Sequence, residues 1–312
     1  LNQRASPYVV FFTLLSYISF TILLNIALNS YYDILLQTRT SGASSFANGV
    51  VFPGGVSESA DGSEKWVDLI KSYGYNQQHF NSLHRAGPLV PLFESDPILC
   101  KFVFRHISLR ITAIRETFEE TGLLLCSRKH CDERVGSWGH FVEDFDTAEW
   151  RKKICKDPLQ LFNLCEKQNC YPDIWSLHYW SNWLSPVTLK KRFDTAFFVV
   201  GLENKPGTIN CNSEASVLGW HPIEDILERN RKLEARLFPP QFYELNRFRL
   251  FRDLSDLVQF ASDRSGYGTD LLYPYIIPTQ DGAVYLLPGT SKYIILTFPY
   301  HSEQRGVFSL LD

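Results

Sequence analysis

Three glutamates that can share one helix face are the strongest chemical signal in the sequence. Glu116, Glu119 and Glu120 are spaced i, i+3 and i+4, so a helix places their carboxylates side by side. A divalent cation would offset their mutual repulsion, because Mg2+ binds carboxylate oxygens together with substrate phosphates. Arg115, four residues before Glu119, can hold that carboxylate in position. The spacing alone leaves open a solvated acidic helix face.

The segment from Ser108 to Leu125 supplies this helix. Gly122 stands where a helix C-cap is expected, and a run of leucines follows it. We therefore predict an amphipathic helix that ends at Gly122 and leads into a strand at 123–125. Its apolar face consists of Leu109, Ile111, Ile114 and Phe118.

A second chemical signal lies in the segment FPGGVSESADG at residues 52–62. The Pro-Gly-Gly turn follows an apolar run, which predicts a strand that enters a loop. Glycines at such a turn allow a partner to approach the backbone closely. The acid Asp61 stands six residues after Gly55.

The string RETFEETGLLL at 115–125 resembles the second half of the Nudix box, G-x5-E-x7-R-E-U-x-E-E-x-G-U, in which U is apolar. Gly55 and Asp61 match the first half, with Asp in place of Glu. Thr117 departs from the pattern, because it occupies an apolar position. The two halves are separated, so residues 62–107 are predicted to be an insertion that splits the box and folds out as a surface excursion.

A split box of this kind resembles one Nudix branch, the peroxisomal coenzyme A diphosphatases of the nucleoside diphosphate-linked moiety X motif 19 type. The resemblance extends over residues 31–290 and includes the strings CYPDIWSLHYWSNWLSP, KRFDTAFFVV, LFPPQFYEL and DGAVYLLPG. It implies an α/β fold, the Nudix α/β/α sandwich with a mixed sheet and added helices. It also implies hydrolysis of the pyrophosphate bond of coenzyme A or acyl-coenzyme A with Mg2+ or Mn2+. The alternatives are another substrate, such as NADH or ADP-ribose, or a catalytically silent Nudix binding module.

The resemblance also implies roles for individual residues. Glu119 and Glu120 match the family's strongest metal ligands, and Glu116 matches a ligand or a residue that assists the base. Arg115 is expected to orient these carboxylates, and the Gly55 carbonyl to complete the metal shell. The other matches are the less essential first acid, the glycine of the box and a candidate outlying acid: Asp61, Gly122 and Glu214.

Recognition of coenzyme A requires a cation for its ribose 3′-phosphate, which NADH and ADP-ribose lack. Two places in the sequence can supply one. Arg39 ends the predicted strand at 31–40, and the run Lys190, Lys191 and Arg192 precedes the strand predicted at 192–202. The alternative for that run is a solvated group of charges.

The N-terminal part of the chain carries a 21-residue apolar stretch at 8–28. Its length suits a membrane-spanning helix, whereas its β-branched and aromatic residues suit one or two buried strands. Both interpretations stay open, and membrane contact through 8–28 is an expectation of the first. We divide the chain into the apolar segment 1–30, a Nudix domain at 31–235 and a C-terminal extension at 236–312.

Composition narrows the partners and the compartment. A net charge of −3 lacks the basic excess of nucleic-acid-binding proteins, so we expect a small-molecule partner and no nucleic acid. Seven cysteines, an odd number, favour reduced thiols and an intracellular location, which the resemblance places in peroxisomes or mitochondria. Two pairs have C-x4-C spacing, Cys126 with Cys131 and Cys165 with Cys170, which is looser than zinc spacing, so a metal site there is disfavoured.

The remaining segments complete the expected architecture. We predict a short helix near 65–73, helical structure over 140–190, a strand and turn leading to a helix at 213–229, a helical pair at 239–261 and a hairpin at 276–289.

Overall fold

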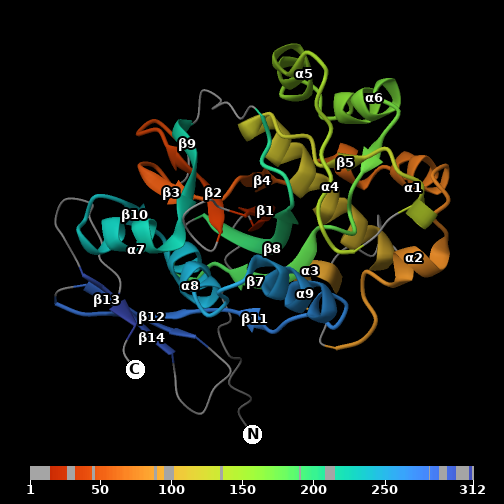
Figure 1. The fold of residues 1–312 in the computed structure, drawn as a ribbon. Helices are drawn as coiled ribbons and strands as arrows, with labels where there is room; N and C mark the ends of the chain where they lie inside the picture. The colour runs from red at the N-terminus through yellow and green to blue at the C-terminus, as the bar shows by residue number, and fades with distance from the viewer. Residues whose placement is uncertain are drawn as a thin grey trace, which may run out of the picture.

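The computed structural model describes residues 15–26, 32–43, 46–87, 90–94, 102–133, 136–189, 191–207, 215–280, 282–287, 294–299 and 309–310 (Figure 1). The strands are β1 Leu15–Asn25, β2 Asp33–Arg39, β3 Gly49–Val51, β4 Gly54–Val56, β5 Cys126–Ser127, β6 Tyr171–Pro172, β7 His178–Leu184, β8 Arg192–Leu202, β9 Ala215–Pro222, β10 Arg236–Leu237, β11 Leu271–Leu272, β12 Tyr275–Pro278, β13 Gly282–Leu287, β14 Ile294–Pro299 and β15 Ser309–Leu310. The helices are α1 Lys65–Lys71, α2 Gln77–Asn81, α3 Pro91–Glu94, α4 Phe102–Thr121, α5 Thr147–Ile154, α6 Gln160–Lys167, α7 Ile223–Arg231, α8 Pro239–Phe248 and α9 Leu254–Ser265, with 3-10 turns at Ser59–Gly62 and Cys131–Glu133.

A mixed sheet forms the centre of the molecule. Its strand order is β10-β3-β2-β1-β8-β7-β11, with β4 paired to β1 and β9 paired to β2. The strand β1 runs parallel to β8 along its whole length and antiparallel to β2 and β4. Strand β1 therefore brings β4, with its two glycines, to the middle of the sheet.

Side chains alternate along β1, which explains why this apolar segment is a strand. One face carries Ile18, Phe20, Ile22 and Leu24, all buried in the same apolar cluster. The opposite face carries Thr21, which bonds to α4: its Oγ1 donates to the Ala113 carbonyl oxygen at 3.2 Å and accepts from Thr117 Oγ1 at 2.9 Å. For Leu15–Asn25 the buried strand is thus confirmed, and a membrane-spanning helix is wrong. Within the described part of the chain, none of the helices combines the length and the apolar character needed to cross a membrane.

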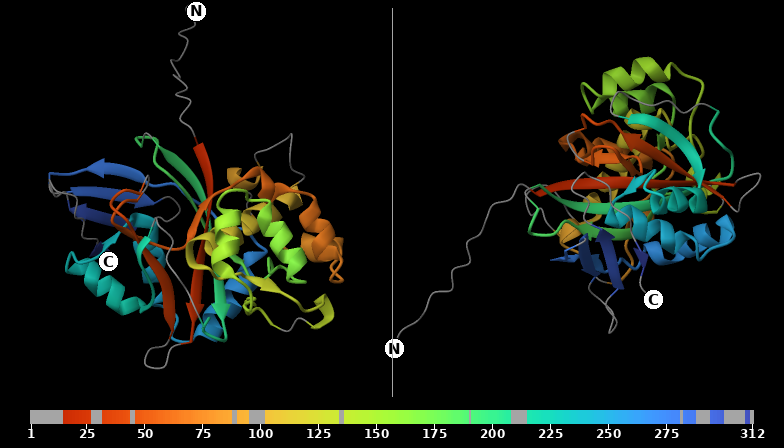
Figure 2. Two further views of the ribbon diagram at one scale, coloured as in Figure 1. Left: turned by 90° about the horizontal axis from the view of Figure 1, so that it is seen from above. Right: turned by 90° about the vertical axis from the view of Figure 1, so that its left-hand side faces the viewer.

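Helices cover both faces of the sheet, as Figure 2 shows from above. One apolar cluster lies between the sheet and the group of α1, α4 and α6, and a second lies between the sheet and α7, α8 and α9. The expected α/β sandwich with a mixed sheet is therefore confirmed. A separate sheet of order β12-β13-β14-β15 contains the predicted hairpin of 276–289, and its Asp281 lies outside the described residues.

The helix α4 carries the glutamates. The residues predicted for its apolar face, Leu109, Ile111, Ile114 and Phe118, are all fully buried. Gly122 follows the helix with φ +81°, the left-handed conformation expected of a glycine C-cap. The helix begins at Phe102, earlier than predicted, and the predicted strand at 123–125 is reduced to a bridge between Leu124 and Val142 before β5.

The insertion at 62–107 contains α1, where a short helix was expected, and also α2, α3 and the first turns of α4. Its apolar side chains belong to the same cluster as the face of α4, and Trp66, Ile70 and Phe80 are at most 2% exposed. We expected a surface excursion, and this was wrong. The insertion instead enlarges the core beside the helix that carries the glutamates.

The region 140–190 was predicted to be helical, and for its second half this was wrong. Helices α5 and α6 occupy the first half, but His178–Leu184 form strand β7, which pairs with β8. Every residue of β7 but the last is buried, so no polar alternation marks it as a strand. The other predicted elements at 31–40, 192–202, 213–229 and 239–261 appear as β2, β8, β9 with α7, and α8 with α9.

The domain boundaries at residues 30 and 235 stay predictions. The central sheet draws strands from both sides of each boundary, since it includes β1 at one end of the chain and β10 and β11 at the other.

Candidate active site

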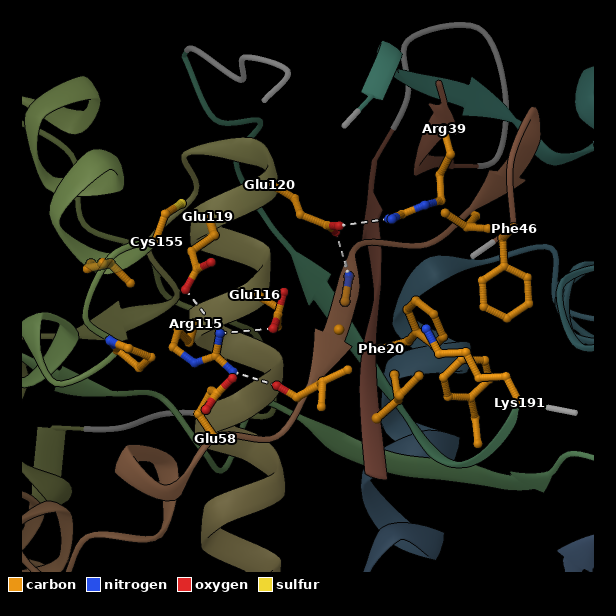
Figure 3. A pocket seen from close by; sticks show the side chains of 18 residues that line it. Phe20, Arg39, Phe46, Glu58, Arg115, Glu116, Glu119, Glu120, Cys155 and Lys191 are labelled. Atoms are coloured by element: carbon orange, nitrogen blue, oxygen red, sulfur yellow. Dashed lines mark hydrogen bonds and ion pairs between the residues drawn. The ribbon is translucent and has the colours of Figure 1, made fainter. Parts of the chain in front are cut away.

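A pocket of about 310 Å3 lies where α4 faces β4 and the ends of β1 and β8 (Figure 3). Carboxylates and Arg115 line one side of it, and the aromatic side chains of Phe20 and Phe46 lie on the other, with Lys191. The lining residues include Arg39, Gly54, Gly55, Glu58, Arg115, Glu116, Glu119, Glu120, Cys155, Lys191 and Phe193. The structure thus brings together most of the residues predicted from the sequence.

Arg115 joins the two halves of the split box. Its Nε and Nη2 donate to the two carboxylate oxygens of Asp61 at 2.9 and 3.0 Å, and Nη2 also donates to the Val56 carbonyl oxygen at 2.7 Å. Its Nη1 donates to Glu116 Oε1 at 2.9 Å and to Glu119 Oε1 at 3.0 Å. The planar guanidinium therefore fixes two pocket carboxylates against an acid from the other side of the insertion.

Asp61 itself lies behind Arg115 and is 2% exposed. Besides Arg115, its carboxylate accepts hydrogen bonds from the Glu58 backbone N–H at 3.0 Å and from Thr112 Oγ1 at 2.8 Å. All of these partners are donors, so the acid is satisfied within the protein. Its position indicates that it supports Arg115 and does not face the pocket.

Glu120 is held by donors from two neighbouring strands. Its Oε2 accepts from Gln37 Nε2 at 2.6 Å and from the Gly54 backbone N–H at 2.7 Å, and its Oε1 lies 3.3 Å from Arg39 Nη1. These contacts connect the helix to β2 and β4, so the carboxylate has one orientation. They also confirm that the segment around Gly55 meets the helix, as the split-box interpretation requires.

Burial and mutual repulsion change the acidity of two of the glutamates. Desolvation and, to a smaller extent, the nearby Glu116 carboxylate raise the pKa of Glu120 to about 8, although the hydrogen bond from the Gly54 N–H opposes the shift. Desolvation likewise raises the pKa of Glu116 to about 7, opposed by Arg115 and reinforced by Glu119. Ionising the whole cluster is therefore costly, and a bound cation would lower that cost.

The residues present fit a hard divalent cation. Oxygen donors are the ligands that Mg2+ and Mn2+ prefer, and three carboxylates from one helix face line this pocket. Gly55 leaves room for the Glu116 carboxylate, because a Cβ at this position would collide with that carboxylate as it is placed here. The backbone can then approach the cluster closely, and Glu116, Glu119, Glu120 and the Gly55 carbonyl stay the predicted metal shell.

The C-terminal end of α4 is fixed from outside the pocket by α5. Arg151 donates from Nε and Nη2 to the Glu119 carbonyl oxygen at 3.0 and 2.7 Å, and from Nη2 to the Glu120 carbonyl oxygen at 3.0 Å. An arginine at this end satisfies carbonyls that have no partner within the helix and matches the helix dipole. Cys155, one residue after α5, lines the pocket, and burial together with Glu119 raises the pKa of its thiol to about 11.

The aromatic side of the pocket carries one of the predicted phosphate-binding cations. Lys191 Nζ lies 5.3 Å from the centre of the Phe193 ring, whose centre is 5.8 Å from that of Phe46. Arg192, the next residue, is not among the residues that line the pocket, and its Nε donates to the Ser185 carbonyl oxygen at 3.0 Å. Of the predicted substrate cations, the pocket thus contains Arg39 and Lys191. Lys190 and the candidate acid Glu214 lie outside the described residues.

Several residues that line the pocket or hold its carboxylates were missed from the sequence. Gln37 lies on β2, and Phe20 lies on β1 within the apolar stretch whose structure was left open. Phe46 precedes β3, and neither it nor Glu58 belongs to the matched positions of the box. Only Glu58 had a signal, as an acid in the segment that follows the glycines.

Comparison with known proteins assigns the part of the chain that contains this pocket to one family. The family described as NUDT19 Nudix domain matches residues 18–248. The acyl-coenzyme A diphosphatase NUDT19 of Xenopus laevis is 34% identical over 277 residues, which are 85% of this chain and 72% of that protein. The human protein of the same name is 34% identical over 274 residues, 84% of this chain and 72% of its own length. A crystal structure of a Nudix hydrolase from Alicyclobacillus acidocaldarius has a TM-score of 0.58 at 19% identity, covering 80% of this chain and 97% of its own, which confirms the fold.

Proposed function

We propose that this chain, which belongs to the NUDT19 Nudix domain family, hydrolyses the pyrophosphate bond of coenzyme A or acyl-coenzyme A. The products are adenosine 3′,5′-bisphosphate and (acyl)phosphopantetheine. Relatives that share about a third of its residues are named acyl-coenzyme A diphosphatases, and each is covered over most of its length.

The observation that carries the proposal is one pocket with two chemically different sides. The acidic side, formed by Glu116, Glu119 and Glu120, suits a pyrophosphate bridged by divalent cations. The opposite side offers aromatic surface beside Lys191, which suits an apolar or planar group attached to a further phosphate. Coenzyme A contains both parts: a pyrophosphate, and attached to it an adenosine that carries the further phosphate on its ribose.

The residues of the chain prepare the acidic side for hydrolysis. When bound, Mg2+ or Mn2+ would neutralise phosphate charge and lower the pKa of a water molecule so that it becomes a nucleophile. Arg115 keeps two of the carboxylates aligned, and the donors around Glu120 keep the third aligned, so little reorganisation is needed. Because Glu116 and Glu120 have raised pKa values, cation binding also releases protons from them at neutral pH.

Lys191 is the cation that we assign to the ribose 3′-phosphate, with Arg39 as the second cation of the pocket. Arg39 lies 3.3 Å from the Glu120 carboxylate, so its charge is shared with the metal shell. Lys191 lies over Phe193, where an ammonium group and an aromatic face can bind a nucleotide together. A site built around such a cation discriminates against a substrate that lacks the phosphate, because the charge-assisted hydrogen bond to that phosphate is then not made.

The test is the kcat/KM of the purified protein on coenzyme A, an acyl-coenzyme A, 3′-dephospho-coenzyme A, NADH and ADP-ribose, in Mg2+ and in Mn2+. We expect coenzyme A or its acyl ester to be preferred over the dephospho form by at least about tenfold. In Lys191→Ala this ratio should fall towards one. Arg192→Ala is the matched control, because the neighbouring cation lies outside the pocket.

Each alternative gives a different result in this panel. A preference for NADH or ADP-ribose would assign a different Nudix substrate, and no hydrolysis of any compound would indicate a binding module. Equal kcat/KM for coenzyme A and its dephospho form would refute the role of Lys191 while leaving the reaction intact.

A further inference from the structure

Three cysteine side chains meet in the core beside the β5–β6 ribbon. Cys126 lies on β5, Cys165 on α6 and Cys170 directly before β6, and each is fully buried. The sulfur atoms of Cys126 and Cys165 are 3.8 Å apart, and the three sulfurs all lie within 4.8 Å of one another. The chain therefore gathers three potential soft ligands at one point.

The backbone explains how distant residues reach this point. The ribbon pairs Cys126 with Pro172, which brings the residue before β6 alongside β5. The backbone N–H of Cys170 donates to the Cys165 carbonyl oxygen at 3.0 Å, which holds the end of α6 against the ribbon. Of the two pairs noted from their spacing, Cys165 and Cys170 both belong to the cluster, whereas Cys131 lies apart from Cys126 and its Sγ donates to the Gly74 carbonyl oxygen at 3.1 Å.

The sulfur positions match the geometry of a bound metal. A metal about 2.3 Å from each of three sulfurs holds them roughly 3.8 to 4.0 Å apart, in tetrahedral or trigonal arrangement. The sulfurs of Cys126 and Cys165 already have this separation. The sulfur of Cys170 lies within 4.8 Å of both, so it needs to move by less than about 1 Å. Thiolates of this kind select soft d10 ions, above all Cu+ and Zn2+, over the hard cations that suit the glutamate cluster.

We propose that Cys126, Cys165 and Cys170 form a binding site for a thiophilic d10 cation, separate from the catalytic carboxylates. The number of ligands favours Cu+, because structural Zn2+ takes four ligands and, among the described residues, the cluster supplies three. Three cysteines packed as small apolar residues are the alternative. A bound ion would tie α6 to the ribbon and so stabilise the fold.

The experiment uses the full chain, reduced and desalted under anaerobic conditions, with all seven thiols first counted in denaturant. Cu+ is delivered as its coloured bicinchoninate complex, and Zn2+ is delivered in a parallel arm from a coloured chelator complex. We expect uptake of one equivalent of at least one metal, a higher Tm of the loaded protein, and a metal–sulfur shell of three sulfurs at about 2.3 Å by X-ray absorption. The arm that shows this shell identifies the ion.

Variants then locate the ion. Cys126→Ala, Cys165→Ala and Cys170→Ala should each lose the bound equivalent, whereas Cys131→Ser, outside the cluster, should keep it. If an alanine variant fails to fold, the number of sulfur ligands found by X-ray absorption in the wild type tests the site instead. Uptake of neither metal, a shell of oxygen or nitrogen atoms, or uptake that persists in a folded alanine variant would overturn the proposal. The result does not depend on the substrate, so it is independent of the proposed hydrolase activity.

Discussion

Replacing Glu120 by glutamine should stabilise the metal-free protein at alkaline pH while removing its activity. Glu120 is 4% exposed, and burial together with the Glu116 carboxylate raises its pKa to about 8 from an ordinary value of 4.5. Between these two values the folded protein holds a proton that the unfolded chain has lost. The stability of the wild type therefore falls as the pH rises through this window.

The size of the effect follows from the shift. One pH unit corresponds to about 1.36 kcal/mol for a single proton, so between pH 5.5 and 8.5 Glu120 alone lowers the free energy of unfolding by at most about 3 kcal/mol. Glutamine carries no charge at either pH and keeps a carbonyl oxygen for the Gly54 N–H or the Gln37 amide. The glutamine loses the ion pair with Arg39, which forms only when Glu120 is ionised and is already included in the pKa of about 8.

The assay is urea unfolding in EDTA at pH 5.5 and pH 8.5 for the wild type, Glu120→Gln and the control Glu149→Gln. Between pH 5.5 and pH 8.5, the free energy of unfolding should fall by up to about 3 kcal/mol more in the wild type than in Glu120→Gln. Saturating Mg2+ should remove most of this difference. Glu149 is an exposed carboxylate of α5 paired with Lys153, so its variant should follow the wild type. An equal loss of stability in the wild type and in Glu120→Gln would show that the ionisation of Glu120 does not cause the pH dependence.

Three further predictions concern the site. Glu119→Gln should reduce kcat by at least about 100-fold with an unchanged circular dichroism spectrum, because it removes charge from the metal shell, and near-wild-type turnover would refute that assignment. Gly55→Ala should displace the Glu116 carboxylate and lower kcat/KM by roughly the same factor while the protein stays folded; unaltered kcat/KM would mean that the backbone does not need to approach the cluster. Arg115→Lys should destabilise the protein by about 2 kcal/mol or more in urea unfolding, because lysine cannot reproduce the paired bonds to Asp61, and a loss below about 0.5 kcal/mol would contradict this role.

The catalytic helix could be predicted from sequence because all of its signals are local. Leu109 and Phe118 mark its buried face, Gly122 marks its end, and the glutamate spacing marks its functional face. The contact between Asp61 and Arg115 was also predictable, although the two lie on either side of the insertion, because a motif specifies both halves. Physical reasoning from spacing alone would have left a solvated acidic face as an equal alternative.

The aromatic side of the pocket could not be predicted from local sequence patterns. Phe20 reaches the pocket because β1 is placed beside β8 and β4, and strand pairing of this kind is not encoded by any one segment. The same holds for β7, whose burial on both faces removes the alternation that identifies a strand. Lys191 and Arg192 are adjacent cations that the sequence alone does not distinguish. Strand β8 begins at Arg192, and only Lys191 lines the pocket. The compartment stays a prediction from the resemblance.

The most direct test of the hydrolase assignment is mass spectrometry of the products that the purified protein forms from coenzyme A in Mg2+. We expect adenosine 3′,5′-bisphosphate and phosphopantetheine in equal amounts, no product in EDTA, and a strongly reduced yield from Glu119→Gln. Unchanged coenzyme A under the same conditions, or cleavage at any bond other than the pyrophosphate, would contradict the assignment.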